Sequence, residues 1–305
     1  LEERILWVRS VSGSAVPSPP DALRAVGWLL GAGAWPEAVR TTGREFKRLT
    51  LEGVTWILLV VLLVALYPWC KRAAARTAES IWKPGNDALP HTLKALLLSL
   101  VMALPLPLLV WGVGWWLAAP ADQVKIGLAV GAGFKQAAMA LLALELMRQV
   151  LRDRGLGDVH FRWRSTGIKH LRLHLRWFIP TVFFTTLVVE SLDAAHDPSH
   201  SESLGRVAFL VGVLALAVFV QRVLRPAGPV FAIYLQRNKG GWIDRARYLW
   251  YPLGVGLPSV LGLLAIQGYY YSAQHLFVRL QTSLWLVLCL ILVNALLLRW
   301  LRLTR

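Results

Sequence analysis

Long uncharged stretches constrain this chain more than any other feature of its sequence. From Tyr248 to Val278 there is no aspartate, glutamate, lysine or arginine, and 56% of all residues are hydrophobic. In the hydrocarbon core of a bilayer, a segment must satisfy its own backbone N–H and C=O groups, so such stretches fold as helices. About 20 apolar residues are enough to cross that core. The sequence therefore predicts an all-α polytopic membrane protein, a bundle of about seven transmembrane helices.

The apolar runs also give a domain division. Residues 1–48 are expected to be the periplasmic or interfacial end of an extracytoplasmic region, and residues 49–305 the transmembrane helical domain. An amphipathic helix is expected from about Asp21, with Trp28 and Trp35 near the interface. The predicted spans are 53–69, 95–119, 126–144, 177–192, 205–221, 248–268 and 280–298. Because Tyr248–Val278 is too long for one upright helix, a loop is expected near Tyr269–His275.

Prolines and glycines inside the spans predict local features of the helices. Proline removes a backbone donor and clashes with the preceding turn, so several spans are expected to bend. The prolines in question are Pro105, Pro107, Pro180, Pro252 and Pro258. Gly127 and Gly131 form a G-x-x-x-G pattern, which allows another helix to approach closely.

Basic residues alternate with the spans and predict the orientation. Most of the 33 lysine and arginine residues lie in the segments 71–94, 148–176 and 222–247 and at the C-terminal end. The segments 118–125 and 190–206 are neutral or acidic. Short basic loops stay in the cytoplasm, so the N-terminal side is expected to be periplasmic and the C-terminal side cytoplasmic.

The net charge of +16 is concentrated beside the membrane. We therefore expect anionic lipid of the inner leaflet as the partner, and no nucleic acid.

The segment from Arg148 to Arg176 is the most distinctive loop. Gly155 and Gly157 are expected to end the third span, and a basic interfacial amphipathic helix is expected to follow, with its apolar face against lipid. The candidate contacts to lipid headgroups are Arg162, Trp163, Arg164, Lys169, Arg172 and Arg176.

Enzymatic and metal chemistry find little support in the sequence. His170 and His174 have the i, i+4 spacing of a metal pair, but no carboxylate or cysteine completes the set and the neighbouring residues are cationic. No phosphate-binding, nucleophile-elbow or zinc-protease pattern is present. We therefore expect no catalytic residues, no metal site, no cofactor and no enzymatic activity.

Lys135 is the one charged residue near the middle of a span. Its burial in lipid costs at least about 2.5–3.5 kcal/mol, so it is expected to face protein, a cavity or the headgroups. It is the candidate intramembrane polar site. An alternative function follows from it, a secondary transporter or lipid-substrate carrier with Lys135 in a central cavity.

Two segments resemble a known family. Residues 3–8 (ERILWV), followed by a proline- and serine-rich connector, are similar to the junction between periplasmic and membrane regions in large mechanosensitive channels of the MscS superfamily, of the MscK/MscM type. Residues 155–163 and the basic helix ending at Trp177 resemble that family's first inner-membrane domain. The resemblance implies an ion channel of the bacterial inner membrane, assembled as a homo-oligomer (a heptamer), that responds to osmotic stress.

The same resemblance implies which part of a channel this chain forms. Members of the family end in a glycine- and alanine-rich pore helix and a cytoplasmic β-containing vestibule. Residues 280–298 are rich in leucine, with Ala295 and no glycine, so they are not expected to be the pore helix. The expected function is therefore that of a peripheral tension-sensing transmembrane domain, with the pore and vestibule outside this chain.

Overall fold

The computed structural model describes residues 19–30, 35, 43, 51–81, 89–118, 125–226, 228–230 and 241–303. These residues are almost entirely helical and form no strand. Seven helical segments among them are long and apolar enough to cross a membrane. The predicted all-α polytopic fold is confirmed.

Each spanning segment consists of one helix or of two helices in direct succession. They are α4 (Leu51–Ile81), α5 and α6 (Leu89–Ala103 and Pro105–Ala118), α7 (Lys125–Val150), α8 (Ser165–Ala194), η2 and α10 (Ser201–Gly205 and Arg206–Leu224), α13 (Arg247–Ile266) and α14 (Tyr270–Leu303). The shorter helices are α2 (Pro19–Leu30), η1 (Leu156–His160), α9 (Pro198–His200) and α12 (Trp242–Arg245).

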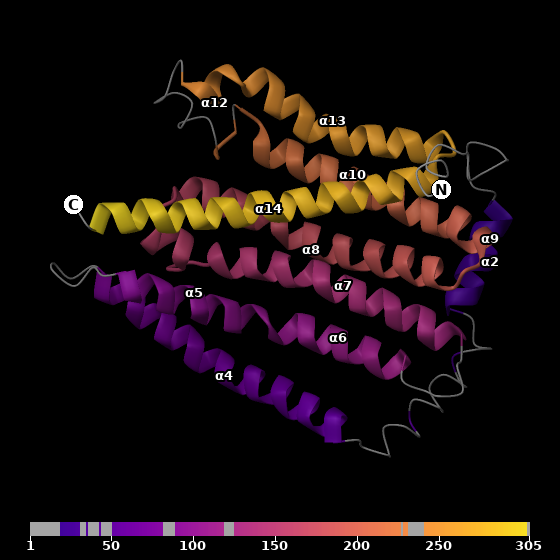
Figure 1. Ribbon diagram of the computed structural model, residues 1–305, viewed down its shortest axis with the longest axis horizontal. Helices are drawn as coiled ribbons and strands as arrows, with labels where there is room; N and C mark the ends of the chain where they lie inside the picture. The colour runs from indigo at the N-terminus through magenta and orange to yellow at the C-terminus, as the bar shows by residue number, and fades with distance from the viewer. Residues whose placement is uncertain are drawn as a thin grey trace.

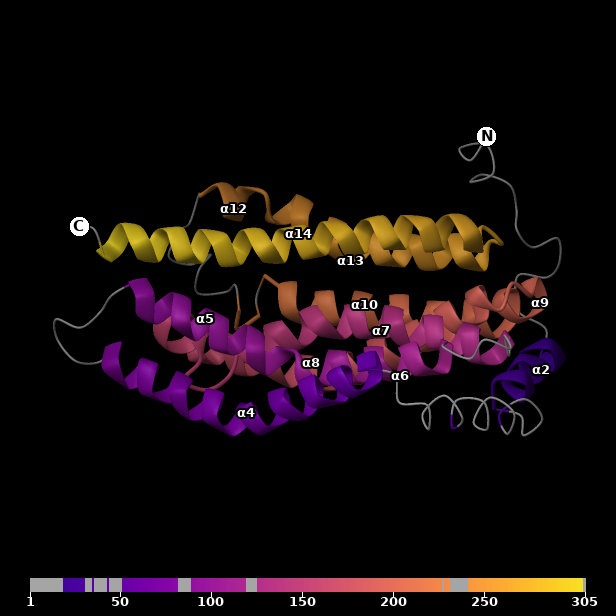
Figure 2. The same cartoon turned by 60° about the horizontal axis from the view of Figure 1, so that its bottom comes forward.

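The spanning helices follow one another in an antiparallel series (Figure 1). The C-terminal end of α4, the start of α5 and the end of α14 lie at the left of that view, and α2 and α9 lie at the right. The closest packing joins α6 to α7 and α7 to α8, which makes α7 the centre of the bundle. Figure 2 shows α13 and α14 as a layer on one side of the other spans.

Small residues allow the backbones around α7 to come close together. A Cβ atom added to Gly131 would lie 2.7 Å from the carbonyl oxygen of Gly114 on α6, and one added to Gly127 would lie 2.7 Å from that of Leu117. On another face of α7, a Cβ on Gly133 would lie 2.7 Å from the Leu187 oxygen of α8. The close approach predicted from Gly127 and Gly131 is therefore confirmed, and its partner is α6.

The second span breaks at its prolines, as expected. Helix α5 ends at Ala103 and α6 begins at Pro105, so Leu104 is a break between two nearly continuous helices. Helix α8 continues past Pro180, and α13 continues past Pro252 and Pro258. A bend at the single residue Leu104 thus divides the second span, while Pro180, Pro252 and Pro258 lie inside unbroken helices.

The last two spans divide earlier than the sequence predicts. A loop was expected near Tyr269–His275, but the turn lies at residues 267–269 and α14 already begins at Tyr270. Gly268 has a φ of 96°, a conformation that side chains other than glycine rarely adopt. The turn is therefore located by Gly268, and polar residues such as His275 belong to the first turns of α14.

The basic amphipathic segment is helical, as expected, but the expected position of its apolar face against lipid is wrong. Residues 165–176 are the first turns of α8, continuous with the fourth span. Its apolar residues Ile168 and Leu175 are buried in the main core, where they pack with Leu141, Phe178 and other residues of α7, α8 and α10. The apolar face of this segment thus contacts protein.

The amphipathic helix expected from about Asp21 is present as α2. Its Trp28 and Leu29, together with Trp35, pack against Ile126 and Val130 near the start of α7. Helix α2 therefore closes the end of the bundle opposite the C-terminus (Figure 1). The segment at residues 3–8 lies outside the described residues.

Candidate functional site at the basic end of the bundle

The fold brings the basic segments together at one end. The end of α4, the loop 151–164, the start of α8 and the end of α14 all lie at the left of Figure 1. These are the segments in which the sequence concentrates lysine and arginine. We call this the basic end, and it contains the six predicted headgroup contacts.

The loop from Leu151 to Arg164 is compact. It contains the π-helical turn η1, and the backbone N–H of Trp163 donates to the Gly157 carbonyl at 2.7 Å. The indole of Trp163 covers Gly157 so closely that a Cβ there would lie 2.9 Å from the ring. Trp163 also packs against Phe161, with ring centroids 5.4 Å apart. Gly157 is required here because only glycine leaves room for this ring.

The six predicted contacts have different surroundings. Arg162, Arg164, Lys169 and Arg176 are exposed. Trp163 is half-buried and packs against the core. The four exposed cations are thus available at the surface, and Trp163 is held in the loop.

Arg172 has an acidic partner within the chain. Its guanidinium forms two bonds to the carboxylate of Asp153, at 2.5 and 2.8 Å. The hydrogen bond from Arg172 holds the pKa of Asp153 below its usual range. This pair connects the loop to the start of α8. It also neutralises the charge of Arg172, one of the six predicted headgroup contacts.

A buried polar junction joins three elements behind this surface. Nδ1 of His160 lies 3.3 Å from the hydroxyl of Thr92 on α5. Arg299 of α14 donates to the backbone carbonyl of His160, and both side chains are buried. Burial, and next the positive charge of Arg299, lower the pKa of His160 to about 4, so the imidazole is neutral at pH 7. Neither His160 nor Arg299 was predicted from the sequence to have a structural role, because the two residues meet only after folding.

Lys135 is half-buried on α7. Among the described residues, no carboxylate lies within ion-pair distance of its ammonium group. Its neighbourhood is the glycine-rich contact with α6, where the Lys135 backbone nitrogen approaches Gly114. The backbone of α7 at Lys135 therefore belongs to this close helix contact.

The two histidines at metal-pair spacing each have another partner. His174 accepts a hydrogen bond from the indole of Trp177 at 3.1 Å, and Nε2 of His170 lies 3.0 Å from the Arg222 carbonyl. In the described part of the chain, no three histidine, cysteine or acidic side chains converge as a metal site. The pair has the contacts of a packed helix surface.

Comparison with known proteins identifies a family that this chain matches over most of its length. Residues 53–305 match the family described as mechanosensitive ion channel inner membrane domain 1. The chain is 29% identical over 238 residues to the miniconductance mechanosensitive channel MscM of Escherichia coli (strain K12), a match that covers 77% of this chain and 21% of that protein. The chain thus spans about a fifth of the length of this curated relative. No solved structure matches.

Proposed function

The chain belongs to the family of the mechanosensitive ion channel inner membrane domain 1, and from this premise we propose that it is the peripheral, tension-sensing part of such a channel. In this proposal the pore helix and the cytoplasmic vestibule belong to a longer protein. The family indicates a channel component and not an enzyme. The protein would act as a homo-oligomer, a heptamer by resemblance to its family.

A gradient of burial across the bundle carries the proposal. In the apolar stretch of α7, 56% of the residues are buried within the molecule, compared with 11% in α4 and 6% in α14. Exposed leucines such as Leu58 on α4 and Leu290 on α14 would face lipid. In this proposal the sparsely buried outer helices contact lipid over a large area, and the inner helices form the core.

The magnitudes favour a sensor made of many helices. Hydrophobic mismatch costs fractions of a kcal/mol per Å for each helix. Seven spans at about 0.3 kcal/mol each give about 2 kcal/mol per Å for one subunit. A shift from about 1% to 99% open needs about 5.5 kcal/mol. A change of 1 Å in bilayer thickness, felt by three or more subunits, therefore supplies enough energy to open a pore.

The orientation follows from charge. We propose a multi-pass protein of the bacterial inner membrane with the basic end in the cytoplasm and the N-terminal side in the periplasm. Arg162, Arg164, Lys169 and Arg176, which are exposed, would contact anionic headgroups of the inner leaflet. Each such contact contributes about 1 kcal/mol. These contacts would fix the depth of the bundle while the outer helices tilt.

A secondary transporter or lipid-substrate carrier remains the alternative function. It requires Lys135 to serve a central cavity, whereas the family match favours the channel. The two functions predict different consequences of Lys135→Ala. A carrier would lose uptake, whereas a channel would keep its pressure response.

Patch-clamp of the full-length protein tests the proposal. Spheroplasts that lack other mechanosensitive channels should show a pressure-activated current. Leu290→Asn, on the lipid-exposed face of α14, should change the pressure threshold and leave the single-channel conductance unchanged. Leu290→Val is the matched control and should behave as wild type. Absence of current despite good membrane expression would refute the channel, and an unchanged threshold in Leu290→Asn would refute the sensing role of α14.

A further inference from the structure

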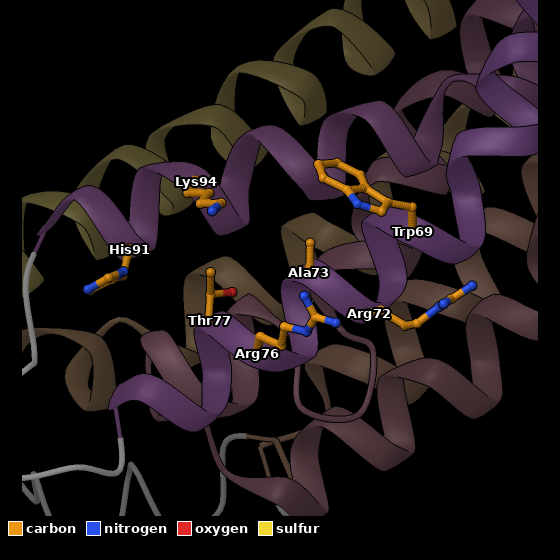
Figure 3. Close-up of a pocket in the computed structure, with 7 residues that line it drawn as sticks. All are labelled: Trp69, Arg72, Ala73, Arg76, Thr77, His91 and Lys94. Carbon is orange, nitrogen blue, oxygen red and sulfur yellow. The ribbon is translucent and has the colours of Figure 1, made fainter.

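A pocket opens between the ends of α4 and α5 at the basic end, apart from the six headgroup candidates (Figure 3). Its volume is about 330 Å³. The lining residues are Trp69, Arg72, Ala73, Arg76 and Thr77 of α4 and His91 and Lys94 of α5. Ligand sites usually begin at about 300 Å³, so the pocket has room for a small headgroup but not for acyl chains.

The spacing of the α4 residues creates one side of the pocket. Residues 69, 72, 73, 76 and 77 recur at the i, i+3, i+4, i+7 and i+8 positions that share one helix face. Thr77 is buried and donates to the Ala74 carbonyl at 2.8 Å, which makes it part of the floor. Lys94 faces this stripe from α5 (Figure 3). Two helices thus supply opposite sides of one depression.

The pocket is positively charged and has no internal counter-ion. Arg76 turns toward Ala73 in Figure 3, and Lys94 stands on the facing helix. Arg72 points to the side, where its Nε donates to the Pro68 carbonyl at 3.3 Å. Within the described ranges, no carboxylate lies within ion-pair distance of these three cations. An anion would complement these cations, and phosphate oxygens are acceptors that arginine and lysine bind well.

The surroundings indicate that the anion is part of a lipid. Trp69 is 58% exposed at the pocket edge, and tryptophan is typical of the boundary between headgroups and acyl chains. The same helix continues from there with the exposed apolar residues Leu62 and Leu58. A free phosphate would use only the cations. An amphipathic molecule would use the cations, the tryptophan and the apolar flank together.

We propose that this pocket binds the phosphate of an anionic glycerophospholipid, whose acyl chains lie along the exposed apolar flank of α4. Arg76 and Lys94 bind the phosphate from two helices, and Trp69 marks the depth of the glycerol region. A bound lipid therefore links α4 to α5 at the basic end. This site is independent of whether tension opens a pore.

Equilibrium binding to the full-length protein in detergent tests the site. The probe is a short-chain fluorescent phosphatidylglycerol, followed by anisotropy, with the matching phosphatidylcholine as the zwitterionic comparison. Arg76→Gln combined with Lys94→Gln should weaken phosphatidylglycerol binding about 10- to 30-fold, at about fivefold for each charge removed. Ala73→Phe fills the pocket without changing its charge and should weaken binding as well.

Matched controls separate the pocket from general surface charge. Lys71→Gln combined with Arg302→Gln removes the same charge from exposed positions at the same end that do not line the pocket. This control should bind as wild type. If it loses as much affinity as the pocket variant, if neither pocket variant loses affinity, or if phosphatidylcholine binds equally well, the proposal is overturned.

Inorganic phosphate should not displace the probe at concentrations where unlabelled phosphatidylglycerol does. Equal displacement would assign the site to free phosphate and overturn the lipid.

Discussion

The contact between α6 and α7 allows the sharpest test of the packing, by replacing Gly131 with alanine. The added Cβ would lie 2.7 Å from the Gly114 carbonyl oxygen and 3.0 Å from the Cβ of Ala118. Ordinary van der Waals contact begins at 3.4 Å, so α6 must retreat by about 0.7 Å at this point. Such a shift cannot be made by one flexible side chain, because the obstacle is backbone.

The expected loss of stability follows from two opposing terms. Overpacking costs about 1–3 kcal/mol. Alanine is the better helix former by about 0.5–1 kcal/mol, which offsets part of that cost. From the middle of each range, Gly131→Ala should destabilise the protein by about 1 kcal/mol, and Gly131→Leu by more, since several further atoms enter the same space.

Unfolding of the full-length protein by titration with SDS measures this loss. Gly256→Ala on α13 is the control, because a Cβ there would meet no atom within 4 Å beyond its chain neighbours and the adjacent backbone of its own helix. It should unfold at the wild-type SDS concentration or slightly above it. If Gly131→Ala also unfolds with the wild type, the close approach of α6 and α7 is not a packing contact and the reasoning fails.

Three further predictions concern the basic end. The pKa of His160 is lowered from 6.5 to about 4, so its contribution to stability is complete above pH 6.5 and is lost as the pH falls toward 4. The loss is about 3 kcal/mol, and His160→Gln should flatten this pH dependence of unfolding, whereas an unchanged pH dependence would contradict this role. Arg299→Met removes a charged donor to the His160 carbonyl and should lower the free energy of unfolding by about 1.5–3 kcal/mol in the same titration, whereas an unchanged value would contradict that role. Asp153→Asn weakens an exposed pair with Arg172 and should cost at most about 1 kcal/mol, and a larger loss would show that the pair is structural.

Hydropathy predicts the seven spans because bilayer thickness imposes a length on any apolar helix. It does not give their ends. Helix α14 extends from Tyr270 to Leu303, well beyond the apolar residues 280–298, because polar residues at its start remain helical once Gly268 has made the turn. The G-x-x-x-G pattern on α7 predicted a close contact correctly, since small residues have few other roles in a span.

The sequence does not distinguish lipid from protein as the partner of an apolar face. Ile168 and Leu175 have the spacing of an interfacial helix, but the face that they form packs against the core. Both environments are apolar, so the same residues suit either.

Contacts between distant segments were also beyond the sequence. Arg299 and His160 are far apart along the chain and meet only in the folded protein. Arg76 and Lys94 line one pocket only because α4 and α5 pack side by side. The stripe from Trp69 to Thr77 is the one signal that could have indicated the pocket beforehand. The four exposed headgroup candidates remain predictions.

Cysteine labelling of the two ends of the bundle tests the orientation on which this account depends. The background is Cys70→Ala with Cys289→Ser, which removes both native thiols. Ser165→Cys and Ser199→Cys then introduce one exposed thiol at the start of α8 and one in α9, the short helix that follows α8. In intact spheroplasts, a membrane-impermeant maleimide should label the thiol introduced by Ser199→Cys. The thiol introduced by Ser165→Cys, at the basic end, should be labelled only after the membrane is opened. Labelling with the opposite pattern would place the basic end outside the cell and contradict the account.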